Sequence, residues 1–226
     1  VTFLNLLEDI IPELVNEGYH INIEDAREGQ ELNFITVTQD THKNKKWPKG
    51  HQNVGEPIIL RDYQVSIINQ FLSQPQSLQE IATGAGKTLV TATLSQCVEQ
   101  YGGTLIIVPN KDLVTQTEKD YINLGLDAGV YFGDRKEIGK THTICTWQSL
   151  NVLDKRFKDG ESDLGLHDLT DGISAIIVDE VHMAKADVLK RLLTGPFAKI
   201  PIRWGLTGTI PKEDWAYVSL VVSLGS

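Results

Sequence analysis

The segment Ala82–Thr88 (ATGAGKT) has the composition of a phosphate-binding loop. Gly84 and Gly86 let the backbone turn its N–H groups towards phosphate oxygens, because glycine adopts conformations that other residues avoid. A helix predicted to begin near Lys87 adds the positive end of its dipole. We expect Lys87 to bind the β- and γ-phosphates of a nucleotide, and the Thr88 hydroxyl to bind Mg²⁺. The expected binding residues of this loop are Thr83, Gly84, Ala85, Gly86, Lys87 and Thr88.

One position departs from the usual pattern of such a P-loop. The pattern has a glycine five residues before Gly86, where this chain has Ile81. A turn without a ligand is the alternative interpretation. The apolar strand predicted at Leu78–Ile81 and the helix predicted after Gly86 favour phosphate binding, because a P-loop joins a strand to a helix. A P-loop indicates a nucleotide and leaves the reaction open.

A pair of carboxylates, Asp179 and Glu180, follows a second apolar run. Sheets with helices on both faces bind ligands at the carboxyl ends of their strands. We expect Asp179 to hold Mg²⁺, and Glu180 to orient and deprotonate the water that attacks the γ-phosphate. The alternative is a solvated acidic turn, which the upstream P-loop disfavours.

Three short blocks resemble motifs of the superfamily 2 helicases. Asp179–His182 (DEVH) is similar to their DEAH-type motif II, with Val181 in place of the usual alanine. Thr207–Thr209 (TGT) resembles their motif III. Leu60–Gln64 (LRDYQ) resembles the adenine-recognition segment that precedes their P-loop.

Two further blocks resemble segments that contact nucleic acid in the same family. Thr104–Gln116 resembles motif Ia, and Cys145–Ser149 (CTWQS) resembles the T-x-Q-S/T segment. The five blocks follow the family order from Pro57 to the C-terminus. Within the family they are most similar to the phage UvsW-type and XPB-like groups.

The resemblance implies ATP and Mg²⁺ as cofactors and a division of roles at the ATP site. It implies that Gln64, with help from Arg61, reads the adenine edge. The alternative for Gln64 is a surface residue that caps a helix. It also implies that His182 links the ATP site to Thr207 and Thr209, which relay its state. The alternatives are an ordinary half-buried histidine and threonines that pack in a turn.

The nucleic-acid contacts that the resemblance implies are Lys111, Thr115, Gln116, Thr146 and Gln148. Helix N-termini with hydroxyls or lysines nearby bind phosphates well, so an acidic chain can still hold DNA. Lys111 is equally compatible with a solvated surface charge. Trp147 is predicted to pack in the core rather than to stack on a base.

Apolar runs alternate with helical patterns from Pro57 onwards. We predict an α/β domain of the RecA-like P-loop type, with a mainly parallel sheet covered by helices on both faces. Its strands are expected at Leu78–Ile81, Thr104–Val108, Thr143–Thr146, Ala175–Val178 and Arg203–Thr207, its helices at Lys87–Tyr101 and Lys111–Tyr121, and a polar surface insertion at Asp154–Gly172.

Residues 1–56 differ in pattern, and we predict that they are an α+β remnant of an accessory domain followed by a linker. Helical spacing from Leu4 to Val15 indicates a helix that Asp9 caps and whose first turn contains Pro12. Tyr19–Ile23 and Asn33–Val37 are predicted short strands. The polar stretch Gln39–Glu56, with lysines around Trp47, is predicted to be a solvated linker, with DNA contact as the alternative.

The net charge of −9 disfavours a purely electrostatic DNA-binding protein. The two cysteines, Cys97 and Cys145, lack metal-ligand spacing and are predicted to be core thiols, with a disulfide as the alternative. No secretory signal or membrane-spanning run is visible, so we expect a cytoplasmic protein, in the host cytoplasm if a phage encodes it.

We therefore predict an ATP hydrolase that couples hydrolysis to unwinding or branch migration of DNA, in recombination or repair. Single-stranded or branched DNA is the expected partner, and RNA is less favoured. The alternatives are a duplex-translocating ATPase subunit of a restriction or repair complex and an ATP-sensing regulatory module. A small-molecule kinase would not need the Leu60–Gln64 or Cys145–Ser149 segments.

The chain begins at Val1 rather than Met and ends at Ser226, shortly after the Thr207–Thr209 block. We expect residues 57–226 to be the first motor domain, with a second motor domain in the parent chain. Helicases of this family need both domains, so the isolated chain is not expected to unwind a duplex.

Overall fold

The computed structural model describes residues 6–23, 31–82, 84–181, 186–209, 220–221 and 223–224. Thr83 and His182, both predicted site residues, therefore lie outside the described residues. Cys97 and Cys145 are free thiols, as predicted. Among the described helices, none combines the length and the apolar character needed to cross a membrane.

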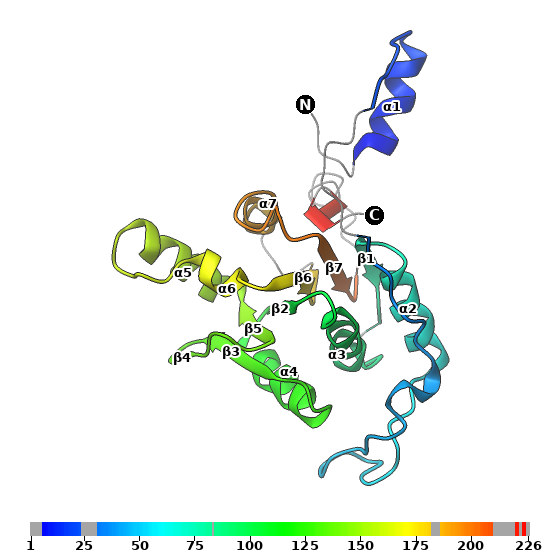
Figure 1. The fold of residues 1–226 in the computed structure, drawn as a ribbon, viewed down its shortest axis with the longest axis vertical. Helices are drawn as coiled ribbons and strands as arrows, with labels where there is room; N and C mark the ends of the chain where they lie inside the picture. The colour runs from blue at the N-terminus through cyan, green and yellow to red at the C-terminus, as the bar shows by residue number, and fades with distance from the viewer. Residues whose placement is uncertain are drawn as a thin grey trace.

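Within the described residues, seven strands form one sheet (Figure 1). Every neighbouring pair is parallel except β3 and β4, so the predicted mainly parallel sheet is confirmed. The sheet order is β1-β7-β6-β2-β5-β3-β4. The strands are β1 (Gln76–Glu80), β2 (Gly103–Val108), β3 (Ala128–Phe132), β4 (Arg135–Lys136), β5 (His142–Thr146), β6 (Ile173–Val178) and β7 (Ile202–Thr207).

Helices cover both faces of the sheet, because the central strands are apolar on both sides. Ile106 and Val108 of β2 pack with α4, whereas Leu105 and Ile107 pack with α5 and α7. One face carries α2 (Asp62–Leu72), α3 (Lys87–Val98) and α4 (Lys111–Asn123), and the other carries α5 (Trp147–Lys158), α6 (Leu166–Thr170) and α7 (Ala186–Thr194).

The N-terminal predictions fail in three details. Helix α1 (Leu7–Asn16) begins before Asp9 and contains Pro12 in its interior, so Asp9 does not cap it. The expected strands at Tyr19–Ile23 and Asn33–Val37 are irregular coil. Their β-branched and aromatic residues favour strands, but within the described part of the chain no strand pairs with them, and Ile35 is 87% exposed.

The predicted linker Gln39–Glu56 is folded and packs against α3 and α4. It opens with the 3-10 helix η2 (Gln39–His42). The Trp47 N–H donates to Glu56 O (3.0 Å), and the Ile58 N–H donates to Lys45 O (2.9 Å). These bonds close a compact loop that contacts α3 and α4 through His42 and Trp47.

The predicted insertion Asp154–Gly172 is likewise folded rather than loose. Leu166 and Leu169 of α6 are buried among residues of α5. Asp154 is buried and accepts hydrogen bonds from Lys158 and Arg191, both at 2.8 Å. The polar composition of this stretch reflects one solvated side of two packed helices.

His42 is buried in a way that makes the fold sensitive to acid. Its Nε2 bonds to Thr93 Oγ1 (2.8 Å), while no described protein atom bonds to its Nδ1. Burial, followed by the charge of Lys45, lowers the pKa of His42 from 6.5 to about 4. Protonation would leave a second buried N–H without an acceptor.

The free energy of unfolding is therefore expected to fall as the pH drops below 6.5. Unfolded chains bind the His42 proton near pH 6.5 and folded chains only near pH 4, so this loss reaches about 2 kcal/mol at pH 5. Urea unfolding at pH 7.5 and pH 5 measures it. His42→Gln should shrink the difference between the two pH values, whereas replacing the exposed His20 with Gln should not. An equal difference in the parent and the His42 variant would contradict the assignment.

Candidate ATP site

The P-loop occupies the carboxyl end of β1 and the start of α3. Gly84 and Gly86 have φ values of 81° and 76°, in the left-handed region that favours glycine. A Cβ on Gly86 would lie 2.6 Å from Gln64 Nε2, so a larger residue there would displace the Gln64 amide. No side chain caps the first turn of α3, which leaves its backbone N–H groups available for an anion.

Lys87 and Glu180 form an ion pair between the P-loop and the end of β6. Lys87 is the first residue of α3 and is only 9% exposed. Glu180 has a φ of 49°, the sole positive φ of a non-glycine residue in the described part of the chain. This uncommon backbone conformation costs energy and is often found at functional sites.

Glu180 also joins the end of β7. Its Oε2 accepts a hydrogen bond from the Gly208 N–H at 3.3 Å. Beside it, Thr207 Oγ1 donates to Thr209 O (2.7 Å), which holds the turn after β7. Since β6 and β7 are neighbours in the sheet, one carboxylate contacts both the P-loop and the Thr207–Thr209 turn.

Asp179 is held at the carboxyl end of β6. Its N–H donates to Ile107 O of β2 (2.9 Å), and its Oδ1 accepts from the Glu180 N–H (2.9 Å). Among the described residues, no three His, Cys, Asp or Glu side chains gather as a metal cluster. The hard oxygens of Asp179 and Thr88 nevertheless suit Mg²⁺, which usually takes one or two protein ligands and completes its shell with phosphate and water.

The segment before α2 is bonded to the P-loop. Gln64 is 4% exposed, and its Nε2 donates to Ala85 O (3.1 Å) while its Oε1 accepts from the Arg61 N–H (3.0 Å). Tyr63 Oη also donates to Ala85 O (2.8 Å). The Gln64 amide has two hydrogens and two acceptor positions, so one of each remains for a ligand.

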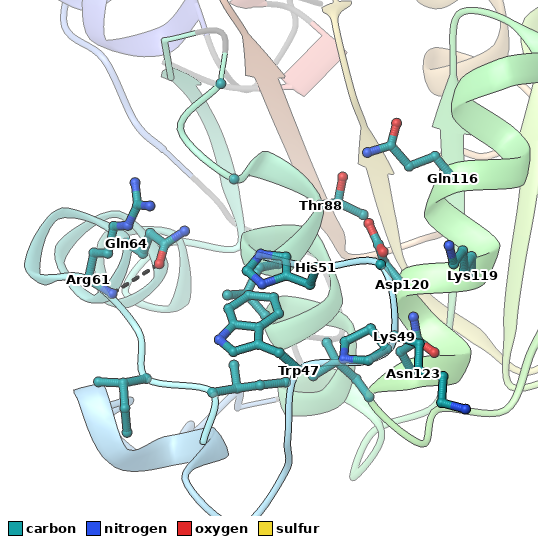
Figure 2. Close-up of a pocket in the computed structure, with 18 residues that line it drawn as sticks. Trp47, Lys49, His51, Arg61, Gln64, Thr88, Gln116, Lys119, Asp120 and Asn123 are labelled. Atoms are coloured by element: carbon teal, nitrogen blue, oxygen red, sulfur yellow. Dashed lines mark hydrogen bonds between the residues drawn. The ribbon is translucent and has the colours of Figure 1, made fainter. Parts of the chain in front are cut away.

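A pocket of about 380 Å³ opens beside the P-loop (Figure 2). At its centre the Trp47 and His51 rings stack, with centroids 3.8 Å apart and planes within 8°. Gln64 lies on one side of this pair and α4 on the other. The lining includes Trp47, Lys49 and His51 of the N-terminal loop, Arg61, Gln64, Gly84, Gly86 and Thr88, and the α4 residues Gln116, Lys119, Asp120 and Asn123.

The α4 side of the pocket is polar. Burial raises the pKa of Asp120, against the lowering effect of the Lys119 and His51 charges. Asn123 Nδ2 is buried, and no described protein atom accepts its hydrogens. Gln116, which we expected to contact nucleic acid, is exposed and also lines this pocket. The four α4 residues that line the pocket are three or four positions apart, so they share one face of the helix. This spacing could have been recognised in the sequence. It is present at Gln116, Lys119, Asp120 and Asn123.

Trp47 and His51 are the residues that sequence reasoning missed. They belong to the stretch predicted as a solvated linker, yet both rings line the pocket beside the P-loop. Only the adjacent aromatic rings hinted at a binding role. Their position depends on how the loop folds over α3, which sequence periodicity does not report.

The predicted nucleic-acid residues divide into exposed and buried ones. Lys111, Thr115 and Gln148 are exposed near the N-termini of α4 and α5. Thr146 is buried and caps α5, accepting from the Ser149 N–H (3.3 Å). Trp147 packs in the core, as predicted. Val108 of β2 is in register with Thr146 of β5. The helices α4 and α5, which follow these two strands, therefore both begin at the carboxyl ends of the strands.

Comparison with known proteins was made for both sequence and structure. Residues 57–212 match the family described as "Type III restriction enzyme, res subunit". The chain is 30% identical over 166 residues to DNA 3'-5' translocase XPB2 of Sulfurisphaera tokodaii, which covers 71% of this chain and 33% of that protein. It is 33% identical over 159 residues to DNA 3'-5' helicase XPB of Mycobacterium tuberculosis, which covers 69% of this chain and 27% of that protein. The chain thus spans about a third or less of these relatives.

Two solved structures share the fold. The UvsW helicase from bacteriophage T4 superposes with a TM-score of 0.72 and 18% identity, over 98% of this chain and 76% of that one. The Pyrococcus furiosus Hef helicase domain superposes with a TM-score of 0.55 and 20% identity, over 73% of this chain and 36% of that one. These likenesses confirm the predicted RecA-like architecture.

Proposed function

The chain belongs to the superfamily 2 helicases, in the family that its residues 57–212 match, and we propose that it hydrolyses ATP to drive movement on DNA. The contact that supports this best joins Lys87, Glu180 and Gly208. A bound γ-phosphate would compete with Glu180 for Lys87. A bound nucleotide would therefore move Glu180 away from Lys87, and Glu180 is the side chain that bonds to the Gly208 N–H at the end of β7.

In the proposed reaction, Lys87 and the backbone N–H groups of residues 83–88 hold the β- and γ-phosphates. Thr88 and Asp179 would hold Mg²⁺, which offsets phosphate charge when bound. Glu180, released from Lys87, accepts a proton from water. The water oxygen then bonds to the γ-phosphorus, the bond to the bridging oxygen breaks, and ADP and phosphate leave.

We propose that the base lies in the pocket beside the P-loop. The stacked Trp47 and His51 rings form an aromatic wall against which a purine would pack, and Gln64, aided by Arg61, supplies the free donor and acceptor. The accessory part, residues 1–56, would thus contribute to the site of the motor part, residues 57–226. Gln116 belongs with this pocket in the proposal rather than with nucleic acid.

We also propose how the site communicates with DNA. His182, which follows Glu180, and Thr207 and Thr209 would transmit the nucleotide state through the turn after β7. Lys111, Thr115 and Gln148 would hold a DNA strand at the N-termini of α4 and α5. Thr146 would act by capping α5 rather than by touching DNA itself.

A translocating subunit that moves on duplex without separating strands is the second candidate. The description of the matching family, which names a restriction enzyme subunit, favours it, whereas the relative from Mycobacterium tuberculosis is named a DNA 3'-5' helicase, which favours strand separation. A module that only senses ATP is disfavoured, because the chain has both Lys87 and Glu180. Two assays distinguish the helicase from the translocating subunit. A helicase should separate the strands of a duplex, whereas a translocating subunit should displace a protein bound to duplex DNA without separating the strands.

The nucleotide preference tests the proposed site. Gln64→Ala should reduce the preference for ATP over GTP about 10-fold, since up to two base hydrogen bonds of about 0.5–1.5 kcal/mol each would be lost. Competition of ATP and GTP against a fluorescent ATP analogue gives the ratio of dissociation constants. The ratio is informative even if the lost bond to Ala85 weakens both nucleotides equally.

Gln70→Ala is the matched control, because Gln70 is an exposed glutamine on the same helix. It should keep the ratio of the parent. If Gln64→Ala also keeps that ratio, the adenine edge is read elsewhere and this part of the proposal fails.

A further inference from the structure

The β3–β4 hairpin and α5 each carry a cation beside the outer strand of the sheet, away from the residues that line the ATP pocket. Lys136 of β4 is paired with Tyr131 of β3, and its Nζ lies 4.3 Å from the centroid of the Tyr131 ring. This cation–π contact fixes a lysine that would otherwise move freely in solvent. Tyr131 is itself buried with Leu153 of α5, so the β3–β4 hairpin packs beside that helix.

Arg156, one turn beyond Leu153 on α5, is the second cation. Burial, followed by the Arg156 charge, lowers the pKa of Lys136, and Asp134 opposes this effect. The same Arg156 charge lowers the pKa of Tyr131, against the larger raising effect of burial. Both groups of the hairpin therefore lie within the electrostatic reach of Arg156.

The neighbouring cations differ from this pair because carboxylates neutralise them. Arg135 makes a bidentate pair with Glu118 and also bonds to Glu137 (2.8 Å). Lys140 pairs with Asp127 (2.8 Å). In the described chain, Lys136 has no carboxylate within ion-pair distance, and Arg156 has only Glu161 at 3.8 Å, with both side chains more than half exposed. Such an exposed pair contributes little.

We propose that Lys136 and Arg156 bind the phosphate backbone of the DNA strand on which the protein moves. Two like charges placed near one another are relieved by an anion, and a DNA phosphate would supply that anion. β3 lies next to β5 in the sheet, and α5 begins where β5 ends. The β3–β4 hairpin is therefore a neighbour of the strand that leads into α5. In this proposal, the DNA strand continues from the N-termini of α4 and α5 along α5 to Arg156 in its last turn and to Lys136 of the hairpin. This inference rests on the proposed function, since it extends the DNA path beyond those N-termini.

The salt dependence of DNA binding tests this contact. The protein is titrated against a fluorescent single-stranded oligonucleotide by anisotropy, at salt concentrations from about 20 to about 200 mM. Each phosphate contact on a single strand contributes about 0.7 to the slope of log affinity against log salt. The double variant Lys136→Gln, Arg156→Gln should therefore lose about 1.4 from the slope of the parent.

The double variant Arg135→Gln, Lys140→Gln is the matched control, since it removes the same charge from the same region. It should keep most of the parent slope, because its cations are already neutralised. The exchange Lys136→Arg, Arg156→Lys should keep the slope as well. All variants should bind the ATP analogue like the parent, because these side chains lie outside the pocket.

Three results would overturn the inference. If the parent binds DNA and the Lys136, Arg156 variant keeps its slope, the contact is wrong while the proposed function stands. If the control loses as much slope, only net charge matters. If the parent binds no DNA even at the lowest salt, both the contact and the DNA partner are wrong.

Discussion

Replacing Lys87 with alanine is expected to abolish ATP binding and turnover. The variant loses the cation that would hold the β- and γ-phosphates, and charge-assisted contacts of this kind contribute about 1.5–3 kcal/mol each. It also leaves the largely buried Glu180 carboxylate without its partner next to the expected phosphate. An uncompensated negative charge there would repel the triphosphate. The affinity should therefore fall about 100-fold or more.

The measurement is titration with a fluorescent ATP analogue in the presence of Mg²⁺, followed by steady-state hydrolysis. Lys199→Ala is the control, because Lys199 is an exposed lysine remote from the pocket. Lys87→Arg separates charge from shape, since it keeps the cation but changes its reach. Parent-like affinity and turnover in Lys87→Ala would contradict the assignment of the P-loop.

Five of the seven described strands could be predicted because buried parallel strands are apolar on both faces, whereas β3 and β4 were not predicted. The runs at 104–108 and 175–178 lie within β2 and β6, and the prediction missed only one or two residues at their N-terminal ends. The same reasoning predicted that Lys87 and Glu180 lie on the same side of the sheet, because both follow the carboxyl ends of parallel strands. The bond from the Gly208 N–H to Glu180 depends on backbone geometry that no residue pattern reports.

The regions that were predicted wrongly are those in which tertiary packing overrides local composition. The lysine-rich stretch around Trp47 has the polarity of a linker, yet His42 and Trp47 anchor it to α3 and α4. Asn33–Val37 has the composition of a strand, but no strand among the described residues pairs with it.

The second large effect is expected from Glu180→Gln. The amide keeps the shape of the side chain, and its oxygen can still accept from the Gly208 N–H. It cannot take a proton from water at neutral pH, so the attacking water loses its base. ATP binding should persist, because Lys87 loses a competitor for the phosphate rather than a ligand. The rate of hydrolysis should fall about 100-fold or more, the usual scale for a general base.

Single-turnover hydrolysis of γ-labelled ATP is the measurement that tests the central claim most directly. Protein is held in excess over ATP, so the observed rate reports cleavage on bound nucleotide. Glu13→Gln, an exposed change on α1, serves as the control and should match the parent. The account predicts that Glu180→Gln binds the ATP but releases phosphate about 100-fold more slowly, or not measurably. Release at the parent rate would show that Glu180 is not the base, and that the Lys87–Glu180 centre is not the site of hydrolysis as described.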